Sequence, residues 1–274
     1  MPSPELSAVY IHPIKSLAAC TVDEAAVEPW GLDGDRRWML VDTAGKVVTQ
    51  RQQPRMALIS ATPVPGGGIV LSAPGSASLA VEVPEPREMT DVLLHRSRLD
   101  VVEAAPRAHA WLGACLGAEV RLVHLDAPDR RRLIDPAYAR PGETVSLADG
   151  YPLLLTTLAS LDALNSLVAG GDHPGEGPVP MDRFRPNAVV AGTAAWAEDA
   201  WTRLSIGDVT FRVVKPSARC VITTTDQHTA RRGAEPLRTL ARHRRSGKEL
   251  LFGQNLIPDT TGVIRVGDPV RILG

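Results

Sequence analysis

The sequence predicts a mixed α/β fold, rich in β-strand, that begins with a β-barrel-like unit and has a few flanking helices. Short apolar runs broken by Pro and Gly recur between residues 7 and 83, which is typical of barrel and sandwich folds. Helical spacing of apolar residues is found in three segments, at 106–116, 158–169 and 234–244. A chain of 274 residues with 44% hydrophobic content is long enough for one large domain or two modest ones.

Composition argues against several classes of protein. The formal net charge of −1 provides no basic surface for nucleic acid. No apolar run has membrane-spanning length and the first residues lack a signal-peptide pattern, so we expect no membrane association and a cytoplasmic location. Three cysteines without a C-x-x-C pair support neither a disulfide framework nor a zinc cluster. Abundant Ala, Arg, Gly and Pro with 4% aromatic residues favour a bacterial source.

The N-terminal strands bring polar residues to their ends. The first strand is expected at Ser7–Ile11, and the turn after it exposes Lys15 and Ser16. Arg36 precedes a second strand at Trp38–Asp42. A hairpin connection, its returning strand and further short strands are expected at Thr43–Lys46, Val47–Thr49 and Met56–Val83.

Two of the helical segments are marked by proline in the first turn. Pro106–Leu116 has an apolar stripe that includes Cys115, and Gly117 suits its end, so Cys115 is interpreted as a core residue. Ala234–Arg244 has an apolar face, with Arg238, Arg242 and Arg244 outside. Cys20 is more ambiguous, and packing is the favoured interpretation.

The third helix follows a buried strand at Tyr151–Leu155 and ends at Gly170-Gly171. Thr157 is a plausible N-cap. Free N–H groups and the helix dipole at such a junction can bind an anion, although a plain strand-to-helix connection is the alternative.

Three loop segments are either rich in Gly and Pro or rich in arginine. Gly170–Pro180 is rich in Gly and Pro and is either a mobile lid or an inert loop. Arg183 and Arg185 precede a strand at Ala188–Ala191, and buried arginines require an anionic partner, which could be a protein carboxylate or a ligand. The run Arg130–Arg132 is interpreted as a solvated face.

Cys220 follows a strand end. The alternating pattern of Ile206–Val214 predicts a half-buried strand, and Pro216 is expected to end it because proline has no N–H to donate. Arg219 directly before Cys220 favours the thiolate, which is the form that binds a soft metal or attacks an electrophile. The alternative is a small buried hydrophobic residue, as most free cysteines are.

No nucleotide-binding, zinc-protease or serine-hydrolase motif is present. Cationic and hydroxyl residues do recur beside strands. If these strands converge, the residues could line one anion-binding pocket next to Cys220; they are Lys15, Ser16, Arg36, Thr157 and Arg185.

Several motifs in the same order resemble the MOSC family, named for the C-terminal domain of molybdenum cofactor sulfurase, with that family's N-terminal β-barrel domain in front. Within that family the sequence resembles the mitochondrial amidoxime-reducing components and their bacterial relatives. The resemblance implies an N-terminal barrel domain at 1–95 and a MOSC barrel domain at 96–274. The motifs are Tyr10–Ser16, Gly34–Trp38, Thr49–Arg55, Phe184–Asn187, Ala197–Asp199, Ile206–Asp208, Arg219–Thr224 and Leu251–Asn255.

The resemblance also implies a molybdenum-molybdopterin cofactor (Moco) and roles for individual residues. Cys220 would be the protein's molybdenum ligand, beside the dithiolene of molybdopterin, with Asp226 and Thr224 near the metal as catalytic candidates. Thr157 or Ser160 would contact the phosphate end of the cofactor. The remaining expected cofactor-binding residues are Lys15, Ser16, Arg36, Arg185, Asn187 and Arg219.

The implied reaction is the two-electron reduction of N-hydroxylated compounds such as amidoximes, hydroxylamines and N-hydroxylated bases. No cysteine follows Cys220, so electrons are expected from an external ferredoxin, flavoprotein or cytochrome. The basic segment Arg238–Arg245 is a candidate docking face for an acidic donor, with a solvated surface as the alternative. A second possible function is a cofactor or sulfur carrier without turnover.

Overall fold

The computed structural model describes residues 3–274 and shows a mixed, strand-rich fold, which confirms the predicted fold class. Within these residues the largest sheet has nine strands. Their order is β2 (Cys20–Val22), β1 (Glu5–Ile11), β14 (Ala188–Ala191), β13 (Leu153–Thr157), β18 (Glu249–Pro258), β16 (Val209–Ala218), β15 (Arg203–Ile206) and β20 (Val270–Ile272), with β17 (Arg245–Ser246) paired to β18.

Three smaller sheets complete the strands of the described part of the chain. The five-stranded sheet contains β10 (Thr90–Leu94), β11 (Ser97–Glu103), β12 (Arg121–His124), β5 (Trp38–Val41) and β6 (Val47–Val48). A second contains β19 (Gly262–Arg265), β3 (Glu24–Glu28) and β4 (Gly31–Leu32). The third contains β7 (Ser60–Pro63), β8 (Ile69–Ser72) and β9 (Leu79–Val81).

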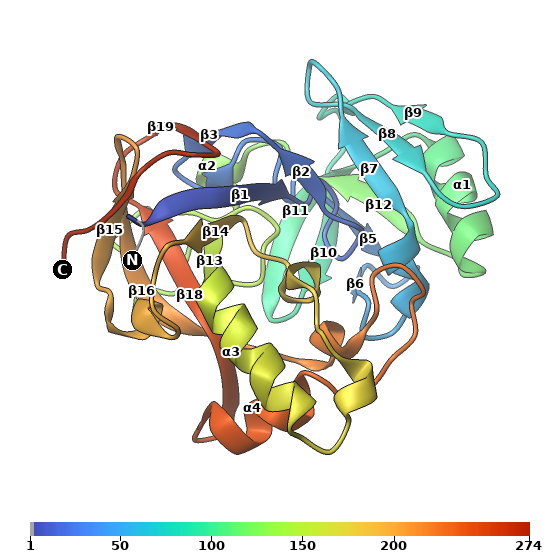
Figure 1. The fold of residues 1–274 in the computed structure, drawn as a ribbon. Coiled ribbons are helices and arrows are strands. Elements are labelled where there is room, and N and C mark those ends of the chain that lie inside the picture. Colours follow the sequence, from blue (N-terminus) through green and yellow to red (C-terminus); the bar gives the residue numbers. More distant parts are fainter. Residues whose placement is uncertain (1–2) are drawn as a thin grey trace.

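Helices are short and lie outside the sheets (Figure 1). The α-helices are α1 (Pro106–Leu116), α2 (Pro128–Arg131), α3 (Leu158–Ala169) and α4 (Leu237–His243). Single turns of 3-10 helix occur at η1 (Pro54–Leu58), η2 (Pro174–Glu176), η3 (Met181–Phe184), η4 (Ala197–Ala200) and η5 (Val221–Thr224).

The first strand belongs to the large sheet together with strands from the second half of the chain. β1 pairs antiparallel with β14, with Val9 opposite Ala188, and also with β2. Its inward side chains, Leu6, Val9 and Ile11, pack in the same core cluster as Phe211. β1 and β14 belong to one continuous sheet, so strands from both halves of the chain lie side by side. The expected domain boundary near residue 95 stays a prediction.

β13, α3 and β14 form a parallel strand–helix–strand unit. The side chain of Thr157 caps α3 by accepting the backbone N–H of Ser160 at 3.2 Å, which confirms the predicted N-cap. The apolar stripe of α3 packs on the sheet through Leu161 and Leu164, in a cluster with Phe184 and Phe252. In Figure 1, α3 and α4 lie together on one side of this sheet.

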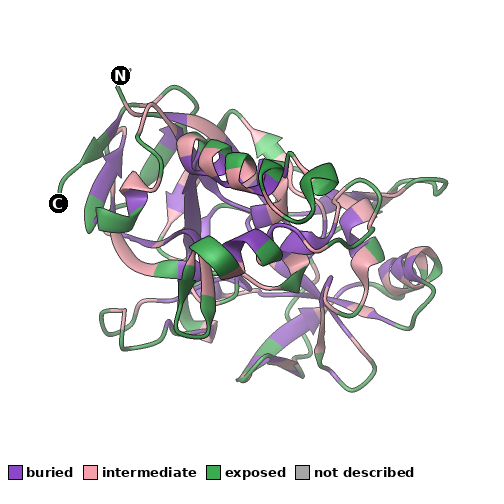
Figure 2. Cartoon of the chain, turned by 60° about the horizontal axis from the view of Figure 1, so that its bottom comes forward, coloured by how far each residue is buried: buried purple, intermediate pink, exposed green. Residues whose placement is uncertain are grey.

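The N-terminal half has separate cores under β5, β7, β8 and α1, where Met56 and Trp38 are almost fully buried. α1 has the predicted bounds, and Gly117 ends it with a φ of 68°, a left-handed conformation that glycine adopts without steric cost. Cys115 is partly buried and packs against this cluster. Figure 2 shows the buried residues concentrated along the central strands and the exposed ones in the peripheral loops.

Two predictions about strands are wrong. Strand β16 does not end at Pro216 but continues to Ala218, because the register shifts on either side of the proline remove the need for its N–H. The sequence also predicts a hairpin at Val263–Ile272 around Gly267-Asp268, but β19 pairs with β3 while β20 pairs with β15. The turn between them therefore divides the chain between two sheets.

Among residues 3–274, no helix is both long and apolar enough to cross a membrane.

Two buried histidines make stability depend on pH. Burial is the main cause that lowers the pKa of His124 to about 4, with Arg37 as a second cause, and burial also holds the pKa of His12 well below its ordinary value. Both groups titrate near pH 6.5 when unfolded. Below about pH 6.5 the unfolded chain therefore binds more protons than the folded one. The contribution of these two histidines to the free energy of unfolding is fully present above that pH and is lost progressively as the pH falls towards their folded-state pKa values.

We expect the free energy of unfolding, measured by urea denaturation, to fall between about pH 7.5 and about pH 5. The substitution His124→Gln should make that fall smaller by about 2 kcal/mol. The same substitution at the exposed His243 provides the matched control variant. An identical pH dependence for His124→Gln and the wild-type protein would contradict this account.

Candidate functional site

A cavity of about 320 Å³ lies between β16, the turn after β1, and the segments before β5 and β13. Six cationic side chains line it, but a single carboxylate, that of Asp149, does so within the described residues. Seven of the predicted site residues are also among its lining: Lys15, Ser16, Arg36, Arg185, Asn187, Arg219 and Cys220. The predicted convergence of polar residues beside Cys220 therefore exists in the structure for this subset.

The backbone is strained at three of these positions. Ser16, Arg36 and Arg185 have φ values of 67°, 49° and 55°, in the left-handed region that non-glycine residues avoid. Such conformations cost about 1–3 kcal/mol each and persist where surrounding contacts impose them, often at binding sites. Here the Ser16 carbonyl accepts the amide of Gln50 at 2.9 Å, and the Arg36 N–H donates to the carbonyl of His12 at 2.8 Å.

Asp35 joins the segments that carry these cations. Its carboxylate is fully buried and accepts the backbone N–H of His12 at 2.7 Å and Nη1 of Arg36 at 2.5 Å. Arg36 in turn donates to Oδ1 of Asn187 at 3.1 Å and to the carbonyl of Arg185 at 3.2 Å. A single carboxylate thus fixes the first strand's end, the segment before β5 and the segment before β14.

Arg185, which is buried, and Arg219, which is half-buried, have no carboxylate partner in the described part of the chain. Arg185 donates from Nη1 to the carbonyl of Leu17 at 2.6 Å, while its buried Nη2 has no partner. Burial, followed by repulsion from Arg36, lowers the pKa of Arg185 to about 9. Burial likewise lowers the pKa of Arg219 to about 10. Uncompensated buried cations favour an anionic ligand.

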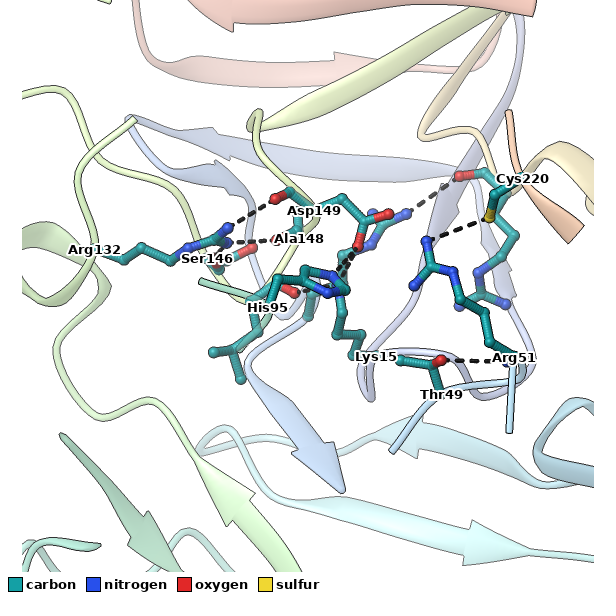
Figure 3. A network of polar contacts seen from close by, with 12 residues as sticks. Lys15, Thr49, Arg51, His95, Arg132, Ser146, Ala148, Asp149 and Cys220 are labelled. Carbon is teal, nitrogen blue, oxygen red and sulfur yellow. Dashed lines mark hydrogen bonds and ion pairs between the residues drawn. The ribbon is translucent and has the colours of Figure 1, made fainter. Parts of the chain in front are cut away.

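Lys15 donates to the carbonyl of Leu147 at 2.9 Å and pairs with Asp149 at 2.5 Å (Figure 3). Burial lowers the pKa of Lys15 to about 8, although Asp149 opposes the shift. Lys15, with His95 at 3.4 Å, holds the pKa of Asp149 well below its usual range. Because this pKa lies only slightly above neutral pH, Lys15 is still mainly protonated at neutral pH but loses its charge in mildly alkaline solution.

Arg132 was expected on a solvated face but is buried behind this cavity wall. It donates to the carbonyls of Ser146 and Asp149, at 2.9 and 2.7 Å, and also to that of Ala148 (Figure 3). The physical reason is that these three carbonyls, left without backbone partners by the loop, need a donor. Arg132 therefore shapes the loop that presents Asp149.

Cys220 lies just beyond β16, where the 3-10 turn η5 begins. Nη2 of Arg51 lies 3.3 Å from its Sγ (Figure 3). Sequence analysis did not identify Arg51, Asp149 or Lys215 as site residues. Arg51 belongs to the Thr49–Arg55 motif, which was a usable signal, whereas nothing near Asp149 in the sequence indicates its pairing with Lys15.

Thr157 and Ser160 do not line the cavity. Their hydroxyls donate to Oε2 of Glu198 at 3.2 and 2.9 Å, and Glu198 is fully buried. Burial raises the pKa of this carboxyl group. The anion-binding helix start that the sequence suggested is thus taken by a carboxyl group of the protein itself.

Thr224 and Asp226 also lie outside the cavity lining. The turn η5 directs Thr224 inward, where its hydroxyl donates to the carbonyl of Val221 at 2.9 Å. Asp226 pairs with Arg183 at 2.9 Å and accepts the backbone N–H of Thr229 at 2.8 Å. Both residues stabilise the loop after Cys220, and their expected position beside a metal is not supported by these contacts.

We expect Asp35→Asn to lower the free energy of unfolding by about 3 kcal/mol, because it leaves the charge of Arg36 without its partner in a buried position. Urea denaturation at neutral pH measures this change. Asp208→Asn, at an exposed hairpin turn, is the matched control and should change stability little. Equal effects of the two substitutions would show that the buried pair is not essential.

Comparison with known proteins relates this geometry to a family. Residues 3–119 match the MOSC N-terminal beta barrel domain, and residues 142–271 match the MOSC domain. Mitochondrial amidoxime-reducing component 1 of Homo sapiens is 34% identical over 288 residues, which cover 97% of this chain and 82% of that protein. The Mus musculus protein of the same name is 34% identical over 284 residues, covering 97% of this chain and 81% of that protein.

Molybdenum cofactor sulfurase of Danio rerio is 30% identical over 283 residues, which cover 97% of this chain but 34% of that larger protein. Two domain matches in sequence order and relatives that align over almost the whole chain lead to one assignment. The chain belongs to the MOSC family, as a MOSC N-terminal beta barrel domain followed by a MOSC domain.

Proposed function

We propose that this protein is a molybdenum cofactor-dependent oxidoreductase that reduces N-hydroxylated compounds with electrons from an external donor. The observation that supports it most is a lone thiol, Cys220, in a cavity lined by six cations, of which Arg185 and Arg219 have no carboxylate partner among the described residues. Similarity over 97% of the chain to an amidoxime-reducing component supports the choice of substrate class.

The residues of the cavity fit such a cofactor. Its volume of about 320 Å³ falls in the range of about 300–1,000 Å³ typical of ligand sites. The unpartnered Nη2 of Arg185 is suited to a phosphate or pterin oxygen. Among residues 3–274 no group of three or more His, Cys, Asp or Glu side chains is placed to hold a metal ion. Cys220 would share the metal with the sulfur donors of the cofactor.

Cys220 would be the protein's metal ligand, because a thiolate suits a soft metal site. The residues that would hold the pterin and its phosphate are Lys15, Ser16, Arg36, Arg185, Asn187 and Arg219. We leave Thr157, Ser160, Thr224 and Asp226 out of this set, because their side chains contact other parts of the protein. When bound, the cofactor would supply two-electron redox chemistry.

In the overall reaction an amidoxime takes up two electrons and two protons, its N–O bond breaks, and an amidine and water are formed. An external ferredoxin, flavoprotein or cytochrome would supply the electrons. The basic segment Arg238–Arg245 is disfavoured as its docking face, because Arg238 and Arg242 pair with Asp172, at 3.1 and 2.6 Å, and Arg244 pairs with Asp199 at 2.5 Å.

A second candidate function is a carrier that holds the cofactor, or delivers sulfur, without turnover. The 30% identity to a molybdenum cofactor sulfurase over nearly the whole chain favours this alternative. The same cavity would serve both functions, so reduction of a substrate is the property that separates them.

Protein produced in a host that makes molybdopterin should contain nearly one molybdenum per chain by elemental analysis. Cys220→Ala should retain less than about a tenth of that metal, because the protein's ligand is removed. Cys115→Ala, which alters a thiol on α1 outside the cavity, is the matched control and should load normally. Full metal loading of Cys220→Ala would refute the assignment of the ligand.

The loaded protein should convert benzamidoxime to benzamidine when reduced methyl viologen supplies electrons, as measured by chromatography of the product. Cys220→Ala should show no conversion above background, whereas Cys115→Ala should match the wild-type rate. Metal-loaded protein that leaves amidoximes, hydroxylamines and N-hydroxylated bases unchanged would exclude the reductase and favour the carrier.

A further inference from the structure

One cation of the cavity, Arg51, differs from the other five in what it contacts. Within the described residues, the guanidinium of Arg51 makes a single hydrogen bond, from Nη2 to Sγ of Cys220 at 3.3 Å. The other five already donate to protein oxygens: Lys15 to Leu147 and Asp149, Arg36 to Asp35 and Asn187, Arg185 to Leu17, Arg219 to Phe184 and Ser217, and Lys215 to Glu249.

Sulfur is a weak acceptor, and a guanidinium carries five N–H donors in a fixed plane. Most of the donor capacity of Arg51 is therefore unused in the described structure. The carboxylate that lines the cavity, Asp149, is itself held by Lys15 at 2.5 Å and His95 at 3.4 Å. Arg51 thus provides positive charge that no carboxylate of the cavity neutralises.

The backbone of Arg51 is held in place, although most N–H donors of its side chain have no partner among the described residues. Arg232 donates to the Arg51 carbonyl at 2.8 Å and also to the carbonyl of Gln50. Gln50 is fully buried and exchanges side-chain hydrogen bonds of 3.1 and 3.2 Å with Gln227. Contacts from the loop after Cys220 therefore hold Arg51 at the sulfur end of the cavity.

We propose that Arg51 determines specificity by binding an anionic group, a carboxylate, on N-hydroxylated substrates, and that it disfavours cationic substrates. The proposal rests on the function proposed above, because a substrate must react beside Cys220 for Arg51 to contact it. A partly buried guanidinium binds a carboxylate through two parallel hydrogen bonds, and a neighbouring cation repels an ammonium group.

The first test compares benzamidoxime with its meta-carboxy and meta-aminomethyl derivatives as substrates of the metal-loaded protein. For Arg51→Met, kcat/KM for the carboxylated substrate should fall about tenfold through KM, while that for benzamidoxime changes less than about threefold. Arg51→Lys should retain most of the preference for the carboxylate. Arg55→Met removes an exposed arginine nearby and should behave as wild type.

An equal loss for the neutral and carboxylated substrates would overturn the proposal, and so would loss of molybdenum from Arg51→Met, which would make Arg51 a cofactor-binding residue. A second measurement does not depend on turnover. Calorimetric titration with benzoate should show about tenfold weaker binding to Arg51→Met than to the wild type, whereas binding of the neutral analogue benzamide should be unchanged.

If the wild-type protein reduces no N-hydroxylated compound, the proposed function fails and the benzoate titration alone decides the proposal. Benzoate affinity that is independent of Arg51 would then reject the binding of a carboxylate at this position. Affinity that depends on Arg51 would keep the anion site and remove the reductase.

Discussion

The fully buried carboxylate of Asp35 holds the cavity wall together. It fixes the backbone after β1 and the side chain of Arg36, and through Arg36 it reaches the segment before β14. These three segments come from distant parts of the sequence, so no one of them could present the cations of the site alone. The left-handed backbone at Arg36 and Arg185 lies within this set of contacts, whereas the left-handed backbone at Ser16 is held by the amide of Gln50.

Because these hydrogen bonds fix the cavity wall, its cations stay buried. Lys15 and Arg185 are removed from water, and their pKa values of about 8 and about 9 show that burial opposes their charge. A flexible cavity would release such strain by moving the side chains into solvent. Here the carbonyls of Leu147 and Leu17 hold them in place, so an anion that enters meets donors already oriented, and little reorganisation is needed.

Sequence patterns predicted the features that depend on local chemistry. Helix α1, the Thr157 cap and the position of Cys220 past a strand end follow from spacing, capping and turn residues, and motif order identified the family. The predictions that failed, and the residues that were missed, concern side chains whose partners are distant in the sequence. Glu198 reaches the start of α3 from 38 residues away, and Arg51 meets Cys220 across 169 residues. Arg132 looks like its two neighbours in sequence, and only the loop at Ser146–Asp149 distinguishes it.

The pairing of β1 with β14 affects how this protein is made on the ribosome. Residues 5–11 are translated well before residues 188–191, the strand beside which they belong. Until then β1 presents an unpaired edge with apolar side chains, which is a feature that favours aggregation. Completion of the large sheet is therefore a late event in biosynthesis, and translation sets the earliest moment at which this edge is covered.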